Sequence, residues 1–338
     1  MRSKQGRDAE PRSVIGWDGI RFTVPGDWNL TGVSGDKAHG YLKVDSPGTA
    51  FLQVKWTDPG RAAPRTPVQM LEQIVRRKFR REATAVGPPD LRGMLDAFLK
   101  DTEKRSRKIG ASFSCKVKPQ TEESDGERIA LHFSWTGSGQ GQGKVWHCRI
   151  CSRTVIAQVV GQGKDPVANL AARIFGEFRD HGDDGWNTWG AFDMIAAAPS
   201  DYVLMAHKFL SGYMRLELTA SGKGKIVLER WGLAHLARRK FSLRDWLGQT
   251  VGADRYAAVF EEVTLNEHVG VRGAGRVRSP LGVLQAVRDA LPSLRPAVEY
   301  EACAWECDET NKLYAVQTWQ PKASATIMGD LVTRCECH

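Results

Sequence analysis

No stretch of the sequence approaches the roughly 18–20 consecutive apolar residues that a membrane-spanning helix needs. The N-terminal segment Met1–Ser13 is polar and charged, so it lacks the apolar core of a secretory signal. The seven cysteines are an odd number in a chain of 338 residues, which does not fit a disulfide scaffold. Together these absences predict a protein of the reducing cytoplasm that has no membrane-bound form.

The sequence also lacks the spacings by which common catalytic sites are recognised. None of its eight histidines lies in an H-E-x-x-H pattern, and no G-x-S-x-G elbow is present. Residues 137–144 are glycine-rich but do not form a phosphate-binding loop, because Ser138 stands where that loop needs glycine and Val145 follows the lysine. We therefore expect these residues to form a mobile hairpin tip, and we expect a non-enzymatic protein without a cofactor, zinc being the one alternative.

What the sequence does contain is an internal repeat, in which landmarks of the first half recur in the same order in the second half. Each half opens with aromatic residues around a proline and then runs through a Gly-Tyr pair into a strand-like segment that ends in tryptophan. Each half later carries a Trp-x-Cys triplet and closes with a segment expected to be helical, at residues 168–181 and 325–338. The matched landmarks are Trp17, Phe22, Pro25 and Trp28 with Trp189, Phe192, Pro199 and Tyr202; Gly40 and Tyr41 with Gly212 and Tyr213; Trp56 with Trp231; and Trp146 and Cys148 with Trp305 and Cys307.

The repeat predicts two modules of ordinary domain size, at residues 14–182 and 186–338, after a disordered tail at residues 1–13. A polar, glycine-rich joint separates the modules at residues 181–185. The two middles differ most. Residues 90–108 read as a charged helix, whereas residues 270–279 are glycine-rich and precede an apolar helix at residues 280–291. We expect these divergent middles to contact a partner.

Alternating and β-rich runs predict antiparallel strands at residues 21–24, 41–44, 51–56, 129–135, 155–160, 213–218, 226–231 and 312–319. Helix starts are expected at Thr66 and Ser242. Helices on antiparallel sheets make an α+β fold, here two tandem copies of a sheet flanked by helices. Phe22, Pro25 and Trp28 match the F-x-x-P-x-x-W opening of the Mog1/PsbP/DcrB-like superfamily, which the first 60 residues of each half resemble. That resemblance implies binding, adaptor or assembly work and carries no catalytic residues.

The cysteines offer one possible chemical site. Cys148 and Cys151 have the C-x-x-C spacing with which two thiolates bind one Zn²⁺, and Cys303 or Cys307 could add a ligand. However, the repeat aligns Cys148 with Cys307 but Cys151 with Thr310, which favours a small buried core residue. A redox use of the C-x-x-C pair is a further alternative. The candidate metal ligands are Cys148, Cys151, Cys335, Cys337 and His338.

Basic residues are in excess, giving a formal net charge of +9, and several of them cluster. If the clusters shared one face, they could neutralise phosphates and give salt-sensitive binding to nucleic acid. The alternative is a set of solvated helix faces, partly balanced by neighbouring acidic residues. The candidate partner-binding or nucleic-acid-binding residues are Arg76, Arg77, Lys78, Arg80, Arg81, Lys104, Arg105, Arg107, Lys108, Arg238, Arg239, Lys240, Arg272, Arg276 and Arg278.

Three functional hypotheses follow from these features. The first is a non-enzymatic binding or assembly protein that contacts a protein partner through a two-module surface. The second is a nucleic-acid-binding protein that uses the basic clusters. The third is a zinc or redox protein that uses the cysteines.

Overall fold

The computed structural model describes residues 11–35, 38–58, 89–123, 126–182, 184–276, 298–322 and 326–337. The chain forms two units, here called the first unit (Met1–Ser13 and Arg21–His181) and the second unit (Val14–Ile20 and Gly182–His338). Residues 14–20, which the repeat assigned to the first half, thus lie in the second unit. Among the described residues, no helix is long and apolar enough to cross a membrane.

The first unit contains one large antiparallel sheet. Its order is β3-β4-β5-β10-β9-β8-β6, and β7 also pairs with β8. Short connections explain the antiparallel pairing, because neighbouring strands joined by a tight turn must reverse direction. The strands are β3 (Asn29–Gly35), β4 (His39–Asp45), β5 (Phe51–Thr57), β6 (Ser114–Val117), β7 (Thr121–Glu122), β8 (Arg128–Thr136), β9 (Gln140–Cys148) and β10 (Thr154–Gly161).

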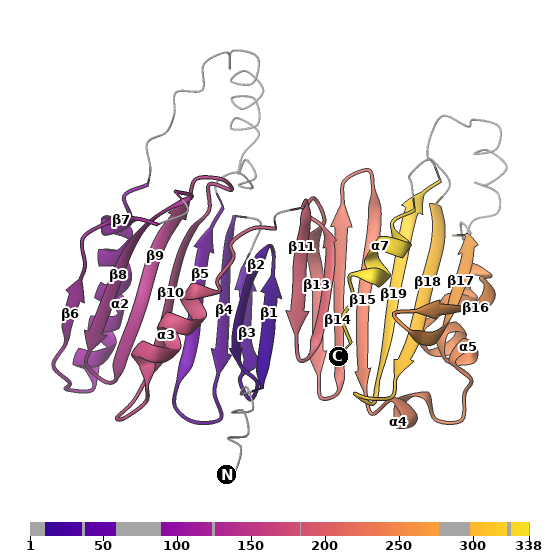
Figure 1. Ribbon diagram of the computed structural model, residues 1–338, viewed down its shortest axis with the longest axis horizontal. Helices are drawn as coiled ribbons and strands as arrows, with labels where there is room; N and C mark the ends of the chain where they lie inside the picture. The colour runs from indigo at the N-terminus through magenta and orange to yellow at the C-terminus, as the bar shows by residue number, and fades with distance from the viewer. Residues whose placement is uncertain are drawn as a thin grey trace, which may run out of the picture. The chain divides into compact units, whose positions relative to one another are not determined.

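Helices pack on both faces of this sheet. The helix α2 (Leu91–Lys108) begins at Asp90, whose side chain accepts a hydrogen bond from the Gly93 amide, and buries leucines against β8. The helix α3 (Val167–Gly176) lies across β9 and β10 (Figure 1). Successive strand residues point to opposite faces. Val145 therefore joins the α2 core, whereas Trp146 points the other way and contacts Phe178, just after α3.

The second unit contains the other large antiparallel sheet, in the order β13-β14-β15-β19-β18-β17-β16. One face packs against α4 (Ala234–Arg238), α5 (Leu243–Asp245) and two turns, η2 (Trp246–Val251) and η3 (Ala253–Tyr256). The helix α7 (Met328–Thr333) contacts β18 and β19. The strands are β13 (Val203–Leu210), β14 (Tyr213–Ala220), β15 (Gly224–Gly232), β16 (Val259–Leu265), β17 (His268–Arg276), β18 (Val298–Cys307) and β19 (Lys312–Pro321).

Shorter strands complete the fold. In the second unit β11 (Trp186–Ala191) pairs with β12 (Met194–Pro199), and β1 (Arg12–Trp17) pairs with β11 at Gly16 and Gly190. Trp17 and Trp189 meet edge to face, with ring centroids 5.6 Å apart. In the first unit β2 (Ile20–Pro25) forms a bridge between Arg21 and Arg179. Strand β1 therefore includes Arg12 and Ser13, which were expected to belong to the disordered tail.

The α+β class with antiparallel sheets is confirmed. Both large sheets have the same strand order: the first three strands run consecutively from one edge, and the later strands follow in reverse sequence order. The expected helix at residues 90–108 is α2, and Ser242 caps α5 by accepting a hydrogen bond from the Asp245 amide. The helices expected to start at Thr66 and to span residues 280–291 lie outside the described residues.

Three local predictions were wrong. The closing helices are shorter than expected and unequal, since α3 ends at Gly176 and α7 at Thr333. Residues 270–276, expected in a variable middle, belong to β17. The glycine-rich tip is mostly strand, because β9 begins at Gln140. The rings of Trp135 and Phe133 on β8 occupy the space that a side chain at Gly141 or Gly143 would need, so these glycines serve packing within a strand.

Candidate functional site

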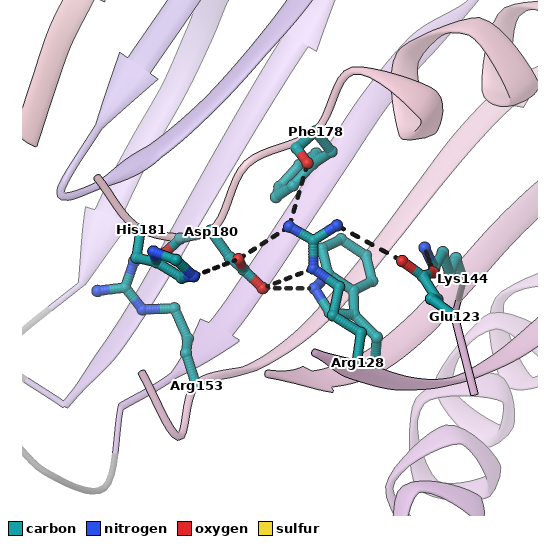
Figure 2. Close-up of polar contacts among 8 residues, drawn as sticks. Glu123, Arg128, Lys144, Arg153, Phe178, Asp180 and His181 are labelled. Atoms are coloured by element: carbon teal, nitrogen blue, oxygen red, sulfur yellow. Dashed lines mark hydrogen bonds and ion pairs between the residues drawn. The ribbon is translucent and has the colours of Figure 1, made fainter. Parts of the chain in front are cut away.

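A buried ion pair lies on the α3 face of the first unit, where β8 begins. Arg128 donates from Nη2 to Asp180 Oδ1 at 2.9 Å and from Nε to Asp180 Oδ2 at 3.2 Å, and Nη2 also reaches the Phe178 carbonyl (Figure 2). Asp180 is 1 % exposed and Arg128 is 6 % exposed. A two-pronged pair of this kind is geometrically specific, so the end of the chain segment after α3 is fixed to the start of β8.

Further donors complete the environment of Asp180. Trp146 donates its indole N–H to Oδ2 at 2.9 Å, and Arg153 donates to the backbone carbonyl of Asp180 at 3.0 Å. Burial alone would raise the pKa of Asp180, but the hydrogen bonds and positive charge of Arg128, helped by Trp146, hold that pKa below its ordinary value. Glu123 lies 3.5 Å from Arg128 and also pairs with Lys144. The cluster is therefore a network of ion pairs and hydrogen bonds.

The C-x-x-C pair adjoins this network. Cys148 is the last residue of β9, and its amide donates to the Arg153 carbonyl at 2.9 Å across a turn in which Ser152 has a φ of 58°. A hydrogen bond from Cys151 lowers the pKa of Cys148 to about 6, and the same bond raises the pKa of Cys151. The donor atoms of Cys148, Asp180 and His181 lie within 4.8 Å of one another. Because Arg128 and Trp146 already bind both Asp180 oxygens, this group is built as an ion pair and not as a metal cage.

The other predicted metal ligands lie in the second unit. Cys337 follows α7 and groups with His268 and Cys307, all three donor atoms lying within 4.8 Å of one another. Cys335 is buried and is not part of that group, and burial raises its pKa above the ordinary thiol range. His338 lies outside the described residues. Sequence reasoning missed His268, because no spacing links a residue at the start of β17 to the cysteines.

Each large sheet also carries a second polar cluster, on the face opposite the one that bears the cluster described above. In the first unit Trp135 donates to Gln158 at 2.9 Å, Gln158 to Gln53 at 3.0 Å, and Gln53 to the Tyr41 hydroxyl at 3.1 Å.

The second unit has a chain of the same kind. Tyr300 donates to Gln317 at 2.9 Å, Gln317 to Glu229 at 2.7 Å, and Tyr213 donates to Glu229 at 2.7 Å. Arg215 adds an ion pair to Glu229 at 2.8 Å. Each sheet thus carries an aromatic donor, a glutamine, a further Gln or Glu and a tyrosine in series.

The basic clusters are only partly available for binding. The described cations on α2, which are Lys104, Arg105, Arg107 and Lys108, are exposed, and Arg107 pairs with Glu103 at 2.6 Å. In the second unit Arg238 pairs with Glu306 at 2.8 Å, and Arg272 pairs with Glu301 at 2.6 Å. Arg276 ends β17 and is exposed. Arg76, Arg77, Lys78, Arg80, Arg81 and Arg278 lie outside the described residues.

Exposed apolar side chains lie near one of these clusters along the chain. We define the α4 surface as Leu233, Leu236, Arg239, Lys240 and Phe241. Its apolar side chains are 57 % (Leu233), 60 % (Leu236) and 39 % (Phe241) exposed. Leu233 and Arg239, which flank α4, both have a left-handed φ, 54° and 55°, which is unusual for residues with a side chain. Within the described part of the chain, Arg239 and Lys240 form no ion pair. The cations of this surface were predictable from the sequence, but its apolar component was not.

Comparison with known proteins gives little beyond this geometry. No protein-family model matches the sequence, and no curated protein matches it. Among solved structures, the chain is similar to the solution structure of cyanobacterial PsbP (CyanoP) from Synechocystis sp. PCC 6803. The two are 13 % identical, with a TM-score of 0.32, and the match covers 54 % of this chain and 99 % of that one.

Proposed function

We propose that this chain is a non-enzymatic binding or assembly protein built from two copies of one module of the Mog1/PsbP-like kind. The shared strand order of the two large sheets supports the duplication. The Trp-x-Cys triplets support it further, because they occupy equivalent positions. Trp146 lies opposite Ala130 on the neighbouring strand, and Trp305 lies opposite Gly270. In each case the residue two positions earlier on that neighbouring strand, Arg128 or His268, contributes to the polar cluster described above.

The α4 surface is the observation that carries the binding role. Apolar side chains gathered on a surface mark interaction sites more often than single exposed residues do. Here three lie within nine residues of each other beside two cations that are unpaired in the described structure. Non-glycine residues held at a positive φ also concentrate at functional sites. The chemistry fits a protein segment that carries acidic residues interleaved with leucine or phenylalanine.

A defined probe tests this proposal. The full chain is titrated into a fluorescein-labelled peptide in which pairs of Glu alternate with Leu and Phe, and binding is followed by fluorescence anisotropy. We expect saturable binding that weakens as salt rises, because the cations contribute. The variants Leu236→Ser/Phe241→Ser and Arg239→Glu/Lys240→Glu should each weaken binding at least tenfold, the effect of losing about 1.4 kcal/mol.

Matched controls come from the first unit. Ile150→Ser removes an equally exposed apolar side chain, and Arg105→Glu/Lys108→Glu reverses two exposed cations on α2. Neither control should change peptide affinity. Equal affinities of the α4-surface variants and the wild type would contradict the proposal. Binding of single-stranded RNA in preference to the peptide, with loss in the α2 control, would instead support the nucleic-acid hypothesis.

A further inference from the structure

We propose that the second unit binds a zinc ion through His268, Cys307 and Cys337. The His268 Nε2 atom lies 3.2 Å from the Cys337 Sγ atom, and all three donor atoms lie within 4.8 Å of one another. A tetrahedral zinc with ordinary bond lengths holds such atoms roughly 3.5–3.8 Å apart. Two cysteines and one histidine are a donor set that suits zinc, and the fourth position would be open to water or to a further ligand.

Three different elements bring these residues together, and each is fixed by contacts of its own. His268 begins β17 just after the turn at Asn266 and Glu267, both of which have a positive φ. The Asn266 side chain donates to the carbonyls of Val332 at 2.8 Å and Cys335 at 2.7 Å, which ties this turn to the end of α7.

Further contacts hold the two cysteines. Cys307 ends β18, and the Glu336 amide donates to the Ile195 carbonyl at 2.8 Å, which holds the segment that carries Cys337. The backbone carbonyl of Cys337 also accepts a hydrogen bond from the Tyr314 hydroxyl at 3.4 Å. The three donors are therefore preorganised by the fold, as a metal site requires.

The first unit provides an internal comparison. There Arg128 stands two residues before the partner of Trp146, and Asp180 accepts the indole N–H of that tryptophan. In the second unit His268 and Cys337 occupy the matching places, since Arg179 and Glu336 each form the isolated bridge that precedes Asp180 and Cys337. In the first cluster the ion pair between Arg128 and Asp180 satisfies the buried polar groups. The second has two thiols and an imidazole, and no carboxylate is among its grouped donors.

A second observation at this site concerns the indole of Trp305. Trp305 is fully buried, and within the described structure its indole nitrogen has no hydrogen-bond partner. Binding of Zn²⁺ would displace the two thiol protons. The resulting Cys337 thiolate would accept a hydrogen bond from the Trp305 N–H, in the way that outer-shell donors support metal ligands.

The test uses the full chain, stripped of metal with a chelator and then titrated with ZnCl₂ against a chromophoric competitor. We expect about one high-affinity equivalent per chain. His268→Ala, Cys307→Ser and Cys337→Ser should each weaken zinc binding at least tenfold. The controls Cys303→Ser, Cys335→Ser and Cys148→Ser change other buried cysteines and should leave the affinity unchanged.

A second readout separates binding from misfolding. Co²⁺ bound by two thiolates gives a thiolate-to-metal charge-transfer band, which should appear in the wild type and in Cys335→Ser but weaken in Cys307→Ser. The double variant His268→Arg/Cys337→Asp installs the residues of the first unit, and should stay folded by circular dichroism while losing the band. Wild-type protein that binds no zinc, or whose zinc is lost only in Cys148→Ser, would overturn the proposal.

Discussion

Replacing Asp180 with alanine is expected to destabilise the first unit by about 3–5 kcal/mol, because it leaves the buried Arg128 without its counter-charge. The indole N–H of Trp146 would lose its acceptor as well. Hydrogen exchange read by mass spectrometry on β8, β9 and β10 across a urea series measures this loss unit by unit. The control Glu177→Ala removes an exposed ion pair with Arg12 and should cost less than about 1 kcal/mol.

The same pair gives a pH dependence with a definite sign. The pKa of Asp180 is lower in the folded chain than in the unfolded chain, so the folded state favours the carboxylate. The stabilisation is therefore complete above about pH 4, the ordinary carboxyl value, and is lost as pH falls through the folded-state pKa. Asp180→Asn should flatten this part of the acid-unfolding curve. A variant that loses stability to the same extent at pH 7 and at pH 3 would contradict the ion-pair account.

Replacing Glu229 with alanine is expected to destabilise the second unit by about 3 kcal/mol. Its carboxylate is nearly inaccessible and accepts hydrogen bonds from Tyr213, Arg215 and Gln317. Removing it leaves these donors unsatisfied inside the protein, and leaves Glu217 as the remaining ion-pair partner of Arg215 in the described part of the chain. The measurement is hydrogen exchange of β14, β15 and β19 in the same denaturant series.

Comparison with the first unit indicates a substitution at Glu229 that should cost less stability than alanine. Gln53 stands in the polar chain where the second unit has Glu229, and it serves there between Gln158 and Tyr41. Glu229→Gln should therefore cost only about 1 kcal/mol, since the amide oxygen can still accept from a neighbour. A loss as large as that of the alanine variant would show that the Arg215 charge, and not the hydrogen-bonded chain, dominates.

The strands with an alternating or β-rich apolar pattern were predictable because that pattern is local. Alternating apolar residues placed β5, β8, β10, β14, β15 and β19, and the charged segment after Asp90 was recognised as the helix α2. No strand was predicted at β1, β3, β6, β7, β9, β11, β12, β13, β16, β17 or β18. The strands β16 and β17 carry many polar or glycine residues, and the edge strand β16 buries little apolar surface.

The register of the repeat was less predictable. Trp146 and Trp305 point to equivalent faces, but Trp56 and Trp231 do not. Trp56 alternates with Lys55, whose ammonium lies over Phe98 of α2, so the tryptophan faces away from α2. Trp231 instead packs on Trp246, on the face covered by α4 and α5. A shift of one residue in register moves every side chain of a strand to the other face of the sheet, and matching residue types along the sequence does not detect such a shift.

The candidate sites were predictable only in part. The match of Cys148 with Cys307 was visible in the sequence, yet their neighbours Arg128 and His268 were not. Arg128 and His268 reach these sites because their strands pair with the strands that carry the cysteines, and no spacing along the chain indicates this. The α4 surface shows the same limit. The sequence identifies Arg238, Arg239 and Lys240 as basic, but only the fold leaves Leu236 exposed beside them.

The binding role itself is tested most directly by a photo-crosslinking amino acid placed at position 236 of the otherwise intact protein, expressed in its native cells. We expect a light-dependent adduct of higher mass that survives nuclease and is destroyed by protease. The same amino acid at position 150, which is also exposed but lies outside the α4 surface, should give none. No adduct from position 236, or an adduct that nuclease removes, would contradict a protein-binding function for this surface.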